Sequence, residues 1–218
     1  MIVYGRNPVR EAERGPRRIL RKWEGLPAEE LERICGSPDH QGVCAEVEPY
    51  EYADPDALLA DQDALVLALD EVQDPHNLGA VCRVAEAAGA AGVVVPERRS
   101  AEVTPAVCKA SAGAVEHLPV ARVRNLADWL ASAKESGAWV YGAEAGAGVP
   151  YHEPDYRGRV ALVLGSEGRG IRPRVAATCD QLVTLPVRGR VGSLNVATAA
   201  AALVYGILQF RGALDRAP

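Results

Sequence analysis

The chain has 218 residues, of which 48% are apolar, and its formal net charge is −5. This length suits one large domain, or one domain with a small appendage, and the apolar content is enough for a packed core. No run approaches the roughly 20 apolar residues of a membrane span, and the start MIVYGRNPVREAERG lacks the apolar core of a signal peptide, so we expect a cytoplasmic protein.

The first 49 residues predict a small α/β unit of β-α-β-α-β order, barely large enough for a core of its own. Its predicted elements, in chain order, are a strand at Met1–Tyr4, a helix from Asn7-Pro8, a strand at Arg17–Trp23, a helix at Pro27–Ile34 and an extended segment at His40–Val47. Residues 50–63 are polar, acidic and contain proline, which predicts a linker with a short helix in DPDALLADQ.

Residues 64–218 predict the main domain, in which short apolar strands alternate with helices. The predicted strands are Ala64–Leu69, Val93–Val95, His117–Val120, Trp139–Gly142, Val160–Leu164 and Gln181–Pro186. The predicted helices are Ala80–Ala90, Thr104–Ala112, Leu126–Ser136, Arg172–Ala177 and a long one after Asn195. This alternation is typical of an α/β fold with a mainly parallel sheet and helices on both faces.

The last helix follows a turn, Gly192-Ser193-Leu194-Asn195, in which Ser193 and Asn195 are good helix-start residues. One face of this helix is small and the other bulky, which predicts close packing against a sheet or a partner chain. A polar, glycine-containing loop before a buried helix is a common place for an anionic or nucleotide ligand. An ordinary strand–loop–helix unit fits the same pattern.

The five cysteines and four histidines are scattered through the chain. They form no CxxC pair and show no metal-ligand spacing, which argues against a disulfide framework and a zinc site, and we expect no metal. Cys82 and Cys108 lie in apolar or small-residue runs, which predicts that they fill the core.

The charges are unevenly distributed along the chain. Net negative charge alone weighs against nucleic-acid binding, but arginines crowd Arg6–Lys22 and the later loops within Arg169–Arg190. A local basic face is one interpretation, and solvated helix and loop surfaces are the other.

Three loops hold nearly all the polar residues of the main domain: Asp74–Gly79, Gly165–Gly170 and Gly192–Asn195. Each lies next to a predicted strand end or helix start, and ligands of open α/β sheets bind at the carboxyl ends of strands. The loop GSEGRG is neither a GxxxxGK[ST] phosphate loop nor a GxGxxG dinucleotide fingerprint, and no GxSxG serine-hydrolase elbow occurs. These absences weigh against a nucleotide-binding oxidoreductase.

Three motifs in this order carry a resemblance: NLGAVCR (Asn77–Arg83), LVLGSEGRGI (Leu162–Ile171) and LPVRGRVGSLNVATAAAA (Leu185–Ala202). They resemble the motifs of the SpoU ribose 2'-O-methyltransferases of the SPOUT superfamily, and the resemblance runs from Ala64 to Phe210. The YGRNPVREA start and the HQGV segment are similar to the substrate-binding domain of the bacterial 23S rRNA guanosine-2'-O-methyltransferase branch.

The resemblance implies a trefoil knot at the C-terminal end of the sheet and a homodimer with its site close to the subunit interface. It also implies a pocket for S-adenosylmethionine lined by Gly165, Leu185 and Leu194. The residues themselves show neither the knot nor the cofactor.

The implied catalytic set is Arg83, Asn77, Glu167, Ser193 and Asn195. Arg83 would lie near the target phosphate and ribose, either as a base or as an electrostatic anchor. Asn77 and Glu167 would hold Arg83 and the loops, while Ser193 and Asn195 would order the turn over cofactor and ribose. A ribose hydroxyl is a poor nucleophile that must lose its proton around the transition state, so a base or a charge beside it helps.

The sequence therefore predicts methyl transfer to a ribose 2'-hydroxyl of RNA, with a guanosine of 23S rRNA as the first substrate and tRNA as the second. DNA lacks the acceptor hydroxyl and is excluded as a substrate. A non-catalytic RNA-binding or ribosome-assembly factor on the same fold is the alternative, and the intact polar set argues against it.

Overall fold

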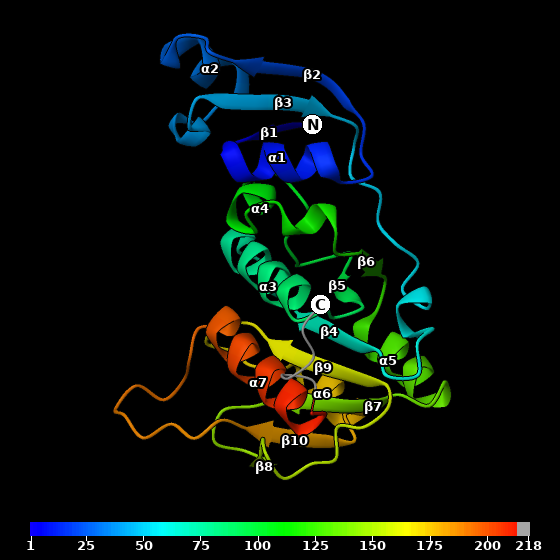
Figure 1. Ribbon diagram of the computed structural model, residues 1–218. Helices are drawn as coiled ribbons and strands as arrows, with labels where there is room; N and C mark the ends of the chain where they lie inside the picture. Colours follow the sequence, from blue (N-terminus) through cyan, green and yellow to red (C-terminus); the bar gives the residue numbers. More distant parts are fainter. Residues whose placement is uncertain (213–218) are drawn as a thin grey trace.

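The computed structural model describes residues 1–212, and the last residues of the predicted main domain, 213–218, lie outside it. Two sheets lie one above the other along the long direction of the molecule, with helices between them (Figure 1). The smaller has three strands in the order β1-β3-β2, and the larger has seven in the order β6-β5-β4-β9-β7-β10-β8. None of the helices within residues 1–212 combines the length and the apolarity needed to cross a membrane.

The front unit has the predicted β-α-β-α-β order, and its three strands are antiparallel. Its core comes from β1, β3 and α1 and includes Val3, Val9, Ala12 and Ala45. Its elements are β1 (Ile2–Tyr4), α1 (Arg6–Arg14), β2 (Ile19–Glu24), α2 (Ala28–Cys35), the 3-10 helix η1 (Pro38–His40) and β3 (Val43–Val47).

A buried ion pair joins the front unit to the main domain. The side chains of Arg17 and Glu116 are 8% and 0% exposed, and Arg17 Nε donates to Glu116 Oε2 at 2.8 Å. A second guanidinium nitrogen, Nη2, donates to Glu116 Oε1, and Nη1 donates to the Glu48 carbonyl at 3.1 Å. The guanidinium carbon also lies 5.5 Å from the centre of the Tyr50 ring, a cation–π contact.

Two further polar contacts cross the same junction. His117 Nε2 lies 3.1 Å from Glu11 Oε2, and Lys109 Nζ donates to the Asp39 carbonyl at 2.7 Å. Helix α1 of the front unit thereby sits directly over α4 of the main domain (Figure 1). Together with the buried pair, these contacts hold the front unit in one orientation.

The predicted linker, residues 50–63, packs along the main domain instead of running free. The Ala53 amide donates to the Val120 carbonyl at 2.9 Å, and the Tyr50 hydroxyl donates to the Leu118 carbonyl at 3.2 Å. This segment therefore continues the main sheet at its β6 edge and adds to the stiffness of the junction.

All neighbouring strands of the large sheet are parallel. Strand β4 pairs with β9 in a register that places Asp70 beside Gly165 at the shared carboxyl edge. The strands are β4 (Leu65–Asp70), β5 (Gly92–Pro96), β6 (Val120–Val123), β7 (Trp139–Ala143), β8 (Val149–Pro150), β9 (Val160–Gly165) and β10 (Gln181–Thr184).

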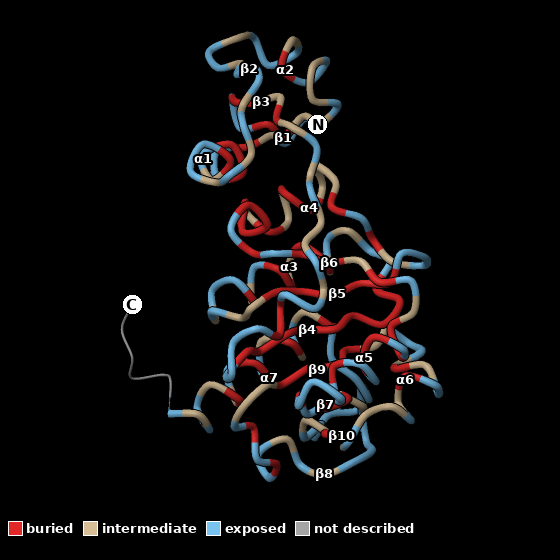
Figure 2. The backbone as a smooth tube through the Cα atoms, turned by 90° about the vertical axis from the view of Figure 1, so that its right-hand side faces the viewer, coloured by how far each residue is buried: buried red, intermediate tan, exposed pale blue. Residues whose placement is uncertain are grey.

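Helices cover both faces of this sheet, and the central strands are buried (Figure 2). One face packs against α3 (Pro75–Ala87), α4 (Pro105–Ala110) and α7 (Val196–Phe210). The other packs against α5 (Leu126–Glu135), α6 (Pro173–Thr178) and the 3-10 helix η2 (Ala57–Leu59). The predicted fold class is confirmed, Cys82 and Cys108 fill the core as predicted, and the trefoil knot stays a prediction.

Some predicted boundaries are wrong. The strand predicted at His117–Val120 is β6, which starts only at Val120, because the 3-10 helix η3 (Ala114–Glu116) precedes it. The His117 amide still donates to the Ala114 carbonyl at 3.0 Å, so the chain is turning at that residue. Strand β8 was not predicted, because two residues carry no periodic signal.

The predicted start of α3 at Ala80 is also wrong, since the helix begins at Pro75. The Asp74 side chain accepts a hydrogen bond from the His76 amide at 2.8 Å, and proline occupies the first helical position. Both are strong start signals. Asn77 therefore lies in the first turn of a helix and not in a loop.

Gly79 allows α3 and α4 to pack in close contact. A Cβ atom at this position would lie 2.5 Å from Ala110 Cβ and 2.9 Å from the Val107 carbonyl oxygen. We expect Gly79→Ala to lower the free energy of unfolding by about 1–3 kcal/mol through overpacking. This loss should exceed the helix-propensity gain of about 1 kcal/mol. Urea unfolding measures the change, and a more stable variant would contradict the close contact.

Candidate active site

The three predicted loops meet at the carboxyl edge of the large sheet. The loop Gly165–Gly170 leaves β9 beside the end of β4, and the turn Gly192–Asn195 leads into α7. Helices α3 and α7 pack side by side, so the first turn of α3 lies next to the first turn of α7 (Figure 1). Segments more than a hundred residues apart in the chain are thus brought together.

Three polar side chains, one from each motif segment, bond to one another, and we call Asn77, Glu167 and Asn195 the polar trio. Asn195 Nδ2 donates to Asn77 Oδ1 at 2.8 Å and also to Glu167 Oε1. Asn77 Nδ2 donates to Glu167 Oε1 at 3.1 Å. The trio therefore ties together segments 90 and 118 residues apart.

The orientation of the Asn195 amide follows from its second role as the cap of α7. Its Oδ1 accepts hydrogen bonds from the backbone amides of Ala197 at 2.9 Å and Thr198 at 3.3 Å. Because the oxygen faces the helix, the NH2 group must face Asn77 and Glu167. The predicted helix-start role of Asn195 is thereby observed, and the same bonds orient the trio.

Glycines set the shape of the loop that carries Glu167. The Gly170 amide donates to the Ser166 carbonyl at 2.9 Å, which closes a tight turn, and Gly168 adopts a φ of 77°. A Cβ at Gly165 would lie 2.1 Å from the Gly170 carbonyl carbon. Only glycine lets the two ends of the loop approach this closely, and the turn presents Glu167 at its tip.

A cavity of about 610 Å³ opens beside this loop. Its walls include the three residues predicted to bind the cofactor, Gly165, Leu185 and Leu194. They also include three of the predicted catalytic residues, Glu167, Ser193 and Asn195. Apolar and polar side chains share the lining, and the volume is within the range of roughly 300–1,000 Å³ typical of small-molecule sites.

A second hollow of about 250 Å³ adjoins the cavity. Asn77 lines only this hollow, whereas Ser166, Glu167 and Arg169 line both spaces. The polar trio consequently stands at the boundary between the larger cavity and the smaller hollow. Such a boundary can bring two molecules together for a reaction.

Arg83 and Ser193 are the predicted site residues that do not join the trio. Arg83 is exposed, lines neither space and has no hydrogen bond or ion pair within residues 1–212. It follows Asn77 by six residues on α3, and helical geometry places it on the face of His76 and Ala80 instead. Within one chain, Asn77 and Glu167 hold each other and not Arg83. Ser193 lines the cavity but has no hydrogen-bond partner in the described part of the chain.

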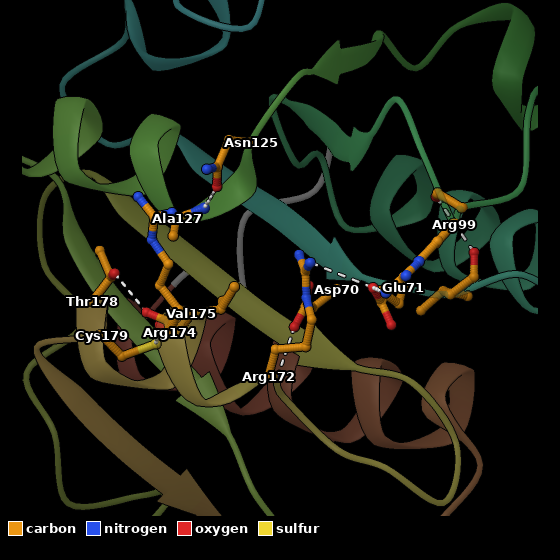
Figure 3. A network of polar contacts seen from close by, with 12 residues as sticks. Asp70, Glu71, Arg99, Asn125, Ala127, Arg172, Arg174, Val175, Thr178 and Cys179 are labelled. Atoms are coloured by element: carbon orange, nitrogen blue, oxygen red, sulfur yellow. Dashed lines mark hydrogen bonds and ion pairs between the residues drawn. The ribbon is translucent and has the colours of Figure 1, made fainter.

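A buried ion pair, not predicted from the sequence, lies behind the Gly165–Gly170 loop. Asp70 is fully buried at the end of β4 and accepts from Arg172 Nε and from the Arg172 amide, both at 2.8 Å (Figure 3). The hydrogen bond to Asp70 raises the pKa of Arg172, against the opposing effect of burial. This pair fixes the chain where it leaves the Gly165–Gly170 loop. The sequence signal that could have revealed this pair is the charged residue Asp70 at the end of the apolar run ALVLAL.

The cysteines of the main domain are not candidate nucleophiles, because burial raises the pKa of Cys82 to about 12 and that of Cys108 to about 11. Thiolates are therefore scarce at neutral pH. Within residues 1–212, no three Asp, Glu, Cys or His side chains gather as metal ligands would.

The part of the chain that contains the large sheet and the three motif segments matches a known family. The SpoU rRNA Methylase family matches residues 64–205, and the family described as RNA 2'-O ribose methyltransferase substrate binding matches residues 22–53. The first match covers well over half of the chain. The chain belongs to the SpoU rRNA methylase family.

Individual relatives agree with this assignment. A Bacillus subtilis protein, YacO, placed in the TrmH family of tRNA/rRNA methyltransferases, is 39% identical over 238 residues, covering 96% of this chain and 95% of the relative. A solved TrmH-family structure from Porphyromonas gingivalis is 32% identical, with a TM-score of 0.80 over 94% of this chain and 88% of that one. The SpoU methyltransferase AviRb from Streptomyces viridochromogenes, solved with AdoMet, has a TM-score of 0.81 at 24% identity, over 97% and 90% of the two chains. The predicted family and the predicted class, an RNA methyltransferase, are confirmed.

Proposed function

We propose that this protein transfers a methyl group from S-adenosylmethionine to a ribose 2'-hydroxyl of RNA, and that a guanosine of 23S rRNA is its substrate. The observation that carries the proposal is the polar trio, which joins the three motif segments at the boundary between two adjoining spaces. We further propose that the protein acts in the cytoplasm as a homodimer.

The residues around the larger cavity fit S-adenosylmethionine. Gly165, Leu185 and Leu194 would hold its adenosine part between backbone and apolar side chains. Two carboxylates, Glu144 and Glu167, also line the cavity, and they suit a ligand that carries positive sulfonium and ammonium groups. The cofactor supplies a methyl group that its sulfonium already makes electrophilic.

The smaller hollow suits the RNA ribose and its neighbouring phosphate. Asn77 and Glu167 offer an amide and a carboxylate there, and Arg169 offers a guanidinium group for a phosphate oxygen. The trio would thus hold the cofactor in one space and the ribose in the other in fixed positions relative to each other. This arrangement supports catalysis over the alternative of an assembly factor, which has no need of a cofactor cavity beside the RNA.

We propose that Arg83 reaches this site from the second protomer of the homodimer. In one chain it faces away from the trio and lines neither space. An arginine is effectively always protonated, so an electrostatic anchor for the target phosphate suits it better than a base. The two-fold symmetry of a dimer would then supply one Arg83 to each site.

The front unit, residues 1–49, would select the RNA, with residues 50–63 joining it to the methyltransferase domain that begins at residue 64. The match of residues 22–53 to a substrate-binding family supports the RNA-selecting role of the front unit. The buried Arg17–Glu116 pair supports a fixed position for the unit relative to the active site.

The substrate is tested by incubating the protein with labelled S-adenosylmethionine and one nucleic acid at a time: unmodified 23S rRNA, unmodified tRNA, or DNA of the same sequence. We expect label in the rRNA and none in the DNA. The relatives named as tRNA/rRNA methyltransferases make tRNA the second candidate, and label in tRNA alone would move the substrate there. Cofactor binding without transfer to either RNA would favour the assembly factor.

A further inference from the structure

A third hollow, of about 350 Å³, lies at the same carboxyl edge beyond the active site. It is formed where β5 and β6 end and where α5 and α6 begin. We call this space the arginine hollow, because five arginines line it: Arg98, Arg99, Arg124, Arg172 and Arg174. None of them belongs to the set predicted from the motifs.

Positive charge is in excess at the arginine hollow. The five guanidinium groups have three carboxylate partners, Asp70, Glu71 and Asp128, which leaves two positive charges unpaired. The unpaired residues are Arg98 and Arg124, which are both exposed and have no ion-pair partner within residues 1–212. Two forked donors facing a shared hollow favour an anion with several oxygens.

Two of the paired arginines share a buried carboxylate beside this excess charge. Arg99 and Arg172 approach the buried Glu71 carboxylate from two sides, each at 3.4 Å (Figure 3). Arg172 also bonds Asp70, so its position is fixed before any ligand arrives. Groups held in position lose less entropy on binding. The first turn of α5 adds little, because the Asn125 side chain already caps the Ala127 amide.

The arginine hollow continues directly from the active site. Glu71 lines both this hollow and the smaller space that contains Asn77 and Glu167. Along the carboxyl edge, the cofactor cavity beside β9 and β10 is followed by the polar trio beside β4 and then by the arginines beside β5 and β6. A chain whose ribose occupies the trio would therefore run over the arginines.

We propose that the arginine hollow binds a backbone phosphate of the RNA segment that flanks the target nucleotide. This inference rests on the proposed function, because it needs an RNA ribose at the polar trio. Phosphate contacts fix the register of a nucleic acid without reading its sequence. Arg98 and Arg124 would thus position the acceptor and contribute to RNA affinity, while the methyl-transfer step depends on the trio.

The test compares the wild-type protein with the double variant Arg98→Ala/Arg124→Ala. We expect the KM for the RNA substrate to rise about tenfold or more, with kcat at saturating RNA and cofactor affinity unchanged. The slope of log affinity against log salt concentration should become shallower by about 0.7, the contribution of the single-strand phosphate contact that is lost. The matched control, Lys134→Ala/Arg157→Ala, removes the same charge near the amino edge of the sheet and should behave as wild type.

Three results would overturn the proposal. The first is a double variant with wild-type KM and salt slope. The second is an equal loss of RNA affinity in the control pair, which would show an effect of net charge alone. The third is a fall in kcat without a change in KM. If the wild-type protein transfers no methyl to RNA, the proposed function fails. Equilibrium binding of the same RNA then decides the inference, with selective loss in the Arg98/Arg124 variant supporting it and equal binding contradicting it.

Discussion

Replacing Arg83 with alanine is expected to lower kcat for RNA methylation by about a hundredfold or more, the scale of losing one electrostatic group at a reacting centre. Arg83 lies outside the cavity proposed to hold the cofactor, so the affinity for S-adenosylmethionine should not change. Single-turnover methyl transfer and cofactor titration measure the two effects separately. Arg157→Ala, which removes a similarly exposed guanidinium near the start of β9, is the control.

Mixing two inactive variants distinguishes the protomer that supplies Arg83. When Arg83→Ala and Glu167→Ala chains are co-expressed, a mixed dimer contains one intact site only if Arg83 acts on the other protomer. Random pairing should then restore about a quarter of the wild-type activity, as the symmetry of a two-fold dimer requires. Full activity of Arg83→Ala alone would remove the residue from the mechanism, and no recovery on mixing would place it in its own site.

Glu116→Ala is expected to lower the free energy of unfolding by about 3–5 kcal/mol, because it leaves a buried guanidinium without its counter-ion. Arg17 would retain only uncharged partners, which are the Glu48 carbonyl, the Cys108 sulfur and the Tyr50 ring. Chemical unfolding monitored by tryptophan fluorescence measures the loss. The pair Arg17→Met/Glu116→Leu removes both charges and should recover most of it.

The exposed pair Arg18–Glu48 provides the comparison for this buried contact. Its side chains are 74% and 43% exposed, so Arg18→Ala should cost less than about 1 kcal/mol. If Glu116→Ala were equally mild, the front unit would not be held by the Arg17–Glu116 pair. A double variant less stable than Glu116→Ala would also contradict that role.

Local sequence signals were sufficient for most of the fold. Apolar runs such as Val160–Leu164 predicted buried parallel strands, and the side chain of Asn195 predicted the start of α7. The errors came where tertiary contacts set the boundary, as at β6, or where a cap was overlooked, as at Asp74. The three motif segments could be found because the residues of each are contiguous in the chain, although Asn77 lies in a helix and not in the predicted loop.

The site was less predictable, because its contacts join distant segments. The bonds of Asn77 and Asn195 to Glu167 depend on the packing of α3 against α7, which no local pattern encodes. The arginine hollow draws residues from three separate segments and exists only where β5 and β6 end together. The family resemblance placed Arg83 in the catalytic set, a role that stays a prediction, and within one chain the helix turns its side chain away from the trio.

The position of the methyl group on the RNA tests the central claim most directly. A 2'-O-methyl group blocks attack of the 2'-oxygen on the adjacent phosphate, so alkali cannot cleave the chain there. Labelled RNA from the wild-type reaction is hydrolysed in alkali and its products are separated by length. We predict that all label appears in alkali-resistant dinucleotides that begin with methylated guanosine. Label in mononucleotides would show base methylation and contradict transfer to a ribose hydroxyl.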